Sequence, residues 1–257
     1  MSQSLFLFFN LLNLKNKKCV AQFLAIFVVC DIFSSLVRQV MRNFSNLMNK
    51  KILNNDITVD NLIHTFKNIL HLEKLFILEV KKIYEIEDGI SEINHYIMSI
   101  TNRAISLNRG FVILAESNNY QSAISLMRLQ IDNCLRLYAL SLYNNPSEFY
   151  KKVLKGEHIR NLKDRDGNKM TDNYLVNKID KIFPQFESLY KKLSGHIHFS
   201  SEHFSFNNKV EDRILSLSVG NVENLEIYKK VDYSFNMFSV GKNLLSLIAE
   251  YRTEISK

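Results

Sequence analysis

Residues 120–143 read YQSAISLMRLQIDNCLRLYALSLY, and the other predicted helices are arranged around this segment. It follows the polar residues 117–119, SNN, which are typical of a tight turn. Drawn as a helix, it is apolar on most of its circumference, whereas a helix at a protein surface has a single apolar stripe. The sequence therefore predicts a central, mostly buried helix at 120–143.

Two long helices are predicted before this segment. Between residues 59 and 75, apolar residues recur mostly every three or four positions, which predicts an amphipathic helix from about residue 56 to residue 87. Asp88-Gly89 ends this helix, and a second one with a similar rhythm extends from about Ser91 to Glu116. Together with residues 120–143, these segments predict three long helices in succession.

Shorter elements follow the central helix. The pattern predicts a helix at 146–154, a polar loop at 155–170, a helix at 171–183, a helix that begins at Pro184, and a last long helix at about 224–255. Residues 204–219 alternate between polar and apolar, which predicts a small β-hairpin. Only 2 Pro and 7 Gly occur in 257 residues, and this scarcity favours helices.

We therefore predict a mainly α protein, a helical bundle with a small β-hairpin near its C-terminal third. Residues 51–257 form the helical-bundle domain, and residues 1–50 form an apolar, helical N-terminal extension. Within that extension, residues 19–37 have roughly the length of a membrane span. Asp31 interrupts them, and a central Asp costs about 2.5–3.5 kcal/mol on insertion scales. We expect a soluble protein rather than a membrane protein.

Composition excludes several classes of protein. The three cysteines form no CxxC pair, so neither a disulfide framework nor a thiolate zinc site is indicated, and a reducing cytoplasm fits best. No phosphate-binding Gly-rich loop, GxSxG, HExxH or EF-hand motif occurs, and we predict neither a cofactor nor a metal. The net charge of +7 permits an anionic partner, although a composition rich in Lys, Asn and Ile also arises from an AT-rich genome.

Arg128, Asp132 and Arg136 lie at four-residue spacing on one face of the predicted central helix. At this spacing the carboxylate of Asp132 can bridge both guanidinium groups. Three interpretations follow: an internal salt-bridge network, an arginine-lined anion site, or simple exposure to solvent. We expect all three side chains to meet the histidine segment at 196–203 in one polar cavity.

The polar loop holds further candidate binding residues. Residues 151–169 contain seven Lys or Arg against three acids, an excess that suits phosphate contacts as well as a solvated loop. Glu157, His158 and Arg160 lie close together within it. Because loops on rigid helices often hold function, these three residues are candidate binding residues.

Residues 189–204, LYKKLSGHIHFSSEHF, contain three of the seven histidines. We expect Gly195 to end a helix, so that His196 and His198 follow in extended geometry on one side, with His203 a short turn away. A histidine with a pKa of about 6.5–7 beside a cation such as Lys192 could perform acid–base chemistry on RNA. The alternatives are a metal site, for which no fourth ligand is evident, and histidines that close a helix end.

The Arg-bearing helix and the later segment with Tyr190, Ser194 and either His196 or His198 resemble a widespread group of uncharacterised bacterial helical proteins. That group in turn looks like a distant relative of the HEPN ribonuclease domains, helical bundles common in phage defence and toxin-antitoxin systems. The resemblance covers about residues 100–250. The HEPN motif is Arg, four to six residues, then His; the nearest approximation here is Lys191 or Lys192 before His198.

The resemblance implies RNA as a partner, a homodimer as the assembly, and an RNA-processing, phage-defence or toxin role. In that hypothesis His196, His198 and Lys192 are catalytic, and Arg128 and Arg136 hold phosphate. The alternative is a non-catalytic helical module that binds a protein or an anionic ligand through the same pocket.

Overall fold

The computed structural model describes residues 57–87, 91–198, 200, 203, 208–211, 214–217 and 225–255. The predicted N-terminal extension and its apolar run at 19–37 lie outside these residues. By its internal contacts the chain divides into residues 1–57 and 58–257, and every element below belongs to the second unit.

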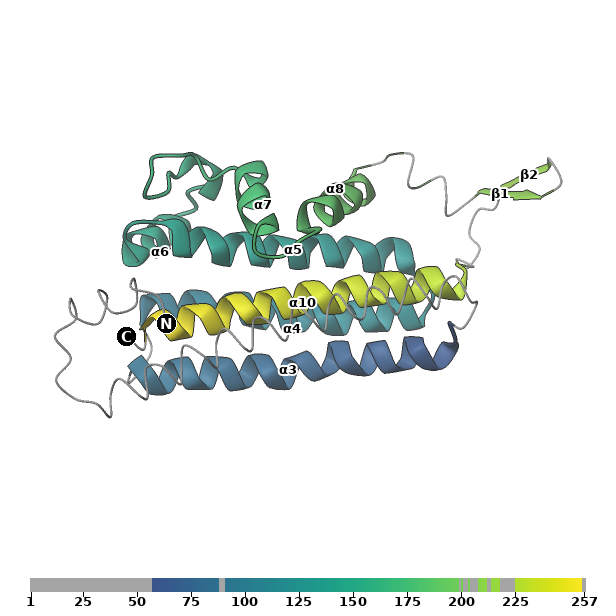
Figure 1. The fold of residues 1–257 in the computed structure, drawn as a ribbon, viewed down its shortest axis with the longest axis horizontal. Helices are drawn as coiled ribbons and strands as arrows, with labels where there is room; N and C mark the ends of the chain where they lie inside the picture. Colours follow the sequence, from purple (N-terminus) through teal and green to yellow (C-terminus); the bar gives the residue numbers. More distant parts are fainter. Residues whose placement is uncertain are drawn as a thin grey trace, which may run out of the picture. The chain divides into compact units, whose positions relative to one another are not determined.

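The described part of the chain is mainly helical, which confirms the predicted class. In chain order its elements are α3 (Val59–Glu87), α4 (Glu92–Glu116), α5 (Tyr120–Leu142), α6 (Pro146–Leu154), the 3-10 helix η1 (Ile159–Asn161), α7 (Asp172–Asp180), α8 (Phe186–Ile197), β1 (Asn208–Glu211), β2 (Ile214–Leu217) and α10 (Ile227–Ile255) (Figure 1). Strands β1 and β2 pair antiparallel, with Asn208 opposite Leu217. Because residues 212–213 and both flanks lie outside the described residues, the hairpin as a whole stays a prediction.

Four long helices form the bundle. α3 packs on α4, α4 on α5, α5 on α10 and α10 on α3, while α6, α7 and α8 pack on α5 (Figure 1). The short loops between α3, α4 and α5 give antiparallel neighbours. The long connection at 143–226 instead lets α10 lie parallel to α5, with Lys230 near the start of α5 at Asn118 and Val240 beside Cys134.

Capping side chains that can be identified in the sequence set the starts of the helices. Each of these residues accepts a hydrogen bond from a backbone N–H of the first helical turn, at 3.1–3.3 Å: Ser91 for α4, Asn119 for α5, Asn145 for α6 and Thr171 for α7. The predicted ends of α4, α5 and α6 agree with the structure to within a residue.

α5 is the central helix, as its composition predicts. Twelve of its residues are buried, and Ile124, Met127, Ile131 and Leu135 are among the largest fully buried side chains. α10 closes the bundle against α3 at Gly241, where an added Cβ would lie 2.5 Å from Cδ1 of the buried Leu72. An alanine here would therefore displace Leu72, and the glycine lets the two helices approach this closely.

The prediction that Gly195 ends its helix is wrong. α8 continues through Gly195 to Ile197, and the amide of His198 bonds to the carbonyl of Ser194 at 3.3 Å. His196 is therefore helical and buried, whereas His198 is exposed. The two side chains do not share the extended geometry expected of them.

Candidate functional site

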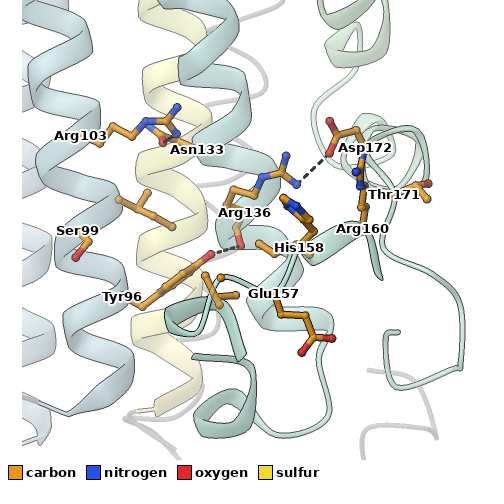
Figure 2. Close-up of a pocket in the computed structure, with 14 residues that line it drawn as sticks. Tyr96, Ser99, Arg103, Asn133, Arg136, Glu157, His158, Arg160, Thr171 and Asp172 are labelled. Carbon is orange, nitrogen blue, oxygen red and sulfur yellow. Dashed lines mark hydrogen bonds and ion pairs between the residues drawn. The ribbon is translucent and has the colours of Figure 1, made fainter. Parts of the chain in front are cut away.

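A cavity of about 810 Å³ opens between α4, α5 and the segment that follows α6. Figure 2 shows side chains from each of these elements around it. α4 contributes Tyr96, Ser99, Ile100 and Arg103; α5 contributes Asn133 and Arg136; the remaining wall comes from residues 153, 156–160 and 171–172. The lining on α4 follows helical spacing of three and four, so one face of α4 supplies it.

The segment after α6 turns back because of Gly156. Its φ of +86° lies in the left-handed region that glycine tolerates best. The amide of Glu157 then bonds to the carbonyl of Lys152 at 3.0 Å, and η1 begins directly after His158. Ile159 is buried, which anchors the turn and leaves Glu157, His158 and Arg160 exposed at the cavity.

The following loop is held by its own hydrogen bonds. The carboxylate of Asp164 accepts from the amides of Asp166 and Asn168, at 3.0 and 2.8 Å, and from the hydroxyl of Tyr174. Arg165 donates to the carbonyls of Ser141 and Leu142 at the end of α5. The loop thereby returns the chain to the first turn of α7, where Asp172 reaches the cavity.

The charged side chains form a continuous row of ion pairs. Asp132 is shared, with one oxygen 2.7 Å from Nη2 of Arg136 and the other 3.1 Å from Nη1 of Arg103. Arg136 extends its other nitrogen to Asp172 at 3.0 Å, as Figure 2 shows. Each of these side chains keeps between 21% and 41% of its surface exposed, and Arg103, Arg136 and Asp172 line the cavity, where a ligand can reach them.

Arg128 lies differently from the prediction. The expected bridge from Asp132 to both Arg128 and Arg136 is half right, because Asp132 pairs with Arg136 and, in place of Arg128, with Arg103 of α4. Arg128 lies 3.9 Å from Asp172, and its guanidinium stacks over the ring of Tyr190 on α8 at 4.3 Å. Such a contact is a cation–π interaction.

The two carboxylates beside Arg136 hold it in its charged form. Burial works against the charged form of Arg136, but Asp132 and Asp172 outweigh this effect and raise its pKa. Burial raises the pKa of Tyr96, and its hydroxyl donates to the carbonyl of Arg136 at 3.2 Å. Both groups therefore keep their ordinary protonation state at neutral pH, with Arg136 as a fixed cation.

Arg103 is also held from inside the bundle. It donates to the side-chain oxygen of Asn133 at 2.6 Å; Asn133 donates to Gln130 at 2.8 Å, and Gln130 donates to Asn108 at 3.1 Å. These three amides, which we call the amide chain, are at most 2% exposed. Buried polar groups need partners, so the amide chain fixes where α4 meets α5 and orients Arg103.

The described residues of the histidine segment, 196–198, 200 and 203, do not line this cavity. His196 of α8 faces α10, where its ring meets the ring of Tyr233 edge-to-face at 6.2 Å. Its ring also lies 6.1 Å from that of His203. Lys192 lies 3.4 Å from Asp232 and 5.0 Å from the ring of Tyr233. The expectation of a single cavity that joins residues 128–136 to residues 196–203 is therefore wrong.

Of the predicted site residues, the cavity brings together Arg136, Glu157, His158 and Arg160, with Asp132 behind them. Arg128 lies between the cavity and α8, and His196, His198, His203 and Lys192 lie elsewhere. The site residues that sequence reasoning missed include Tyr96, Arg103, Asn133 and Asp172. Within the described ranges, no group of three or more His, Cys, Asp or Glu residues is placed to hold a metal ion.

Among the helices that the structure describes, none has the length and apolar character needed to cross a membrane. Comparison of the chain with models of known families, with curated proteins and with solved structures finds no match.

Proposed function

We propose that this protein binds a phosphate-bearing ligand in the cavity between α4, α5 and residues 156–160, with RNA as the first candidate. One observation carries the proposal: Arg103, Arg136 and Arg160 come from three separate elements and face one open cavity. Arginine offers a planar fork that matches two oxygens of a phosphate. Three such groups around one space favour an anion with several phosphate oxygens.

The charges around the cavity suit reversible binding. Two of the arginines are paired with Asp132 and Asp172, whereas Arg160 forms no ion pair with any described residue. We infer that a phosphate first meets Arg160 and then competes with the carboxylates for Arg136. Because carboxylates already partly neutralise the site, binding should be moderate and should weaken as salt is added.

A binding assay tests this proposal. We expect a labelled single-stranded RNA to bind in fluorescence anisotropy, and Arg160→Ala to weaken binding about tenfold, or about 1.4 kcal/mol. The slope of log K against log salt should also fall by about one. Arg109→Ala is the matched control, because Arg109 pairs with Glu73 between α3 and α4 away from the cavity. Equal loss in both variants, or no binding by the wild type, would refute the proposal.

A second candidate function is an HEPN-like ribonuclease with a phage-defence or toxin role. It rests on the resemblance, and one contact favours it: the stacking of Arg128 on Tyr190 joins the Arg-bearing helix to the helix that carries Ser194 and the histidines. In this candidate the exposed His198, with Lys192 nearby in sequence, performs acid–base chemistry on RNA held by the arginines. A homodimer, a cytoplasmic location and a β-hairpin at 204–219 are proposed with it.

Metal-free incubation with total RNA separates the two functions. Cleavage that persists in EDTA and disappears in His198→Ala supports the ribonuclease. His158→Ala is the informative comparison, because His158 lines the cavity and His198 does not. Loss of cleavage in His158→Ala alone would move the catalytic group to the cavity, and RNA binding without cleavage would leave the binding function.

A further inference from the structure

α3 presents an apolar line to solvent in addition to the face that it buries. Ile63, Leu70, Ile77 and Tyr84 follow one another at intervals of seven residues, and each is between 42% and 52% exposed. The core contacts of α3 come from a different set of side chains, among them Phe66, Ile69, Leu72, Phe76 and Ile83. The exposed line is therefore not a poorly covered part of the core.

Lysines alternate with these apolar residues. Lys67, Lys74 and Lys81 each lie four residues after an apolar member and three before the next, and all three are exposed. Neither Lys67 nor Lys74 forms an ion pair with a described residue, and Lys81 lies 3.8 Å from the exposed Glu85. We call these seven residues, 63, 67, 70, 74, 77, 81 and 84, the α3 seam.

The spacing of the α3 seam is that of a coiled coil. Alternate steps of four and three keep a row of side chains on one side of a helix, where they face a partner helix. From residue 63 to residue 84 the seam covers 21 residue-to-residue steps, or about 31 Å at about 1.5 Å per step. An isolated apolar residue at the surface needs no explanation, whereas four that recur on one side of a helix over about six turns need one.

We propose that the α3 seam binds an amphipathic helix of a partner protein, whose apolar residues alternate with Glu or Asp at steps of three and four. The apolar members would pack in layers with the partner's apolar residues, and each lysine layer would meet an acidic side chain. This inference is independent of the function proposed for the arginine cavity.

Charge argues against two other partners for the α3 seam, a second copy of α3 and the N-terminal residues of the same chain. Two copies of α3 paired in parallel would place lysine against lysine in three layers, and an antiparallel pair would place each lysine against an apolar side chain. The chain's own residues 1–56 carry seven Lys or Arg and only two acids, so they do not complement the seam. An acidic helix alone matches both the apolar and the charged layers.

Two synthetic peptides test the proposal on the full-length wild-type protein. Both are 28-residue helices with Leu at every seventh position; four residues after each Leu the first has Glu and the second has Lys. We expect the Glu peptide to bind in fluorescence anisotropy at least tenfold more tightly than the Lys peptide, with the difference shrinking as salt is added. Equal binding of the two peptides, or no binding of either, overturns the proposal.

Variants of the seam add a second criterion. Reversing all three lysines to Glu should invert the preference for the two peptides, and Leu70→Gln with Ile77→Gln should weaken both by at least tenfold. Lys163→Glu is the charge-reversal control, because Lys163 lies in the loop after η1 and should leave the preference unchanged. Self-association that the seam variants abolish, or flotation with phosphatidylserine vesicles in place of peptide binding, would also overturn the proposal.

Discussion

Replacement of Asp132 by Asn should lower stability and tighten anion binding at the same time. Asp132 lies 2.7 Å from Arg136 and 3.1 Å from Arg103, and 21% of its side chain is exposed. Ion pairs at the surface contribute about 0.2–1 kcal/mol each, and breaking a fully buried pair costs about 3–5 kcal/mol. For two pairs of intermediate exposure we expect a loss of about 2 kcal/mol.

The same change removes a negative charge that opposes a bound phosphate. A phosphate about 6 Å from Asp132 would be relieved of about 2–3 kcal/mol of repulsion at an effective dielectric constant of about 20. Solvent in the open cavity reduces this value, so we expect the affinity for single-stranded RNA to rise about five- to tenfold.

Both effects can be measured on the same samples. In a domain of this size 1 kcal/mol shifts Tm by about 2–4 °C, so Asp132→Asn should melt about 4–8 °C below the wild type. Glu85→Gln is the matched control, since its pair with Lys81 is exposed on both sides and should leave Tm unchanged. An unchanged Tm in Asp132→Asn would mean that the ion-pair row contributes nothing. A fall in affinity would mean that Asp132 orients the arginines and does not compete with the ligand.

Two predictions concern the bundle itself. Burial alone would raise the pKa of Glu79, but hydrogen bonds from Lys82 and Arg252 outweigh burial and lower it. The unfolded state therefore binds the proton more readily than the folded state. The stability that Glu79 contributes is present above about pH 4.5 and is lost as the pH falls through the folded pKa. The urea midpoints of the wild type and Glu79→Gln should therefore converge as the pH falls through that folded pKa. Gly241→Ala should destabilise the protein by about 1–3 kcal/mol despite alanine's higher helix propensity, because the added Cβ would push the fully buried Leu72 into a packed core. A higher Tm for Gly241→Ala would contradict this packing.

Local sequence signals predicted the fold well where a capping residue marks the start of a helix. Ser91, Asn119, Asn145 and Thr171 each cap a helix that the sequence placed to within a few residues. Gly195 misled because its lack of a side chain suggested a helix end, whereas tertiary packing of the neighbouring His196 keeps the last turn helical. Propensity at a single residue does not include such packing.

The candidate site was less accessible to sequence reasoning. Periodicity placed Asp132 and Arg136 on one face of a helix, and their contact follows. Arg103 is 29 residues from Asp132 in sequence, and Asp172 is 36 residues from Arg136. These two ion pairs therefore depend on how α4 and α7 each pack against α5. Nothing in the local pattern distinguishes Arg103 from an ordinary exposed arginine. The histidine segment attracted attention through its composition, which says nothing about which helix it faces.

The amide chain ties the spacing of the cavity's arginines to the alignment of two helices. A shift of α4 along α5 by one turn, about 5.4 Å, would carry Asn108 away from Gln130 and Arg103 away from Asn133. Each orphaned buried amide would cost about 1–3 kcal/mol, whereas the apolar layers on either side could re-form with other partners. Among sliding alternatives of similar apolar content, the amide chain therefore selects a single register. A redesigned bundle with a purely aliphatic core would retain its helices, but the distance between Arg103 and Arg136 would no longer be fixed.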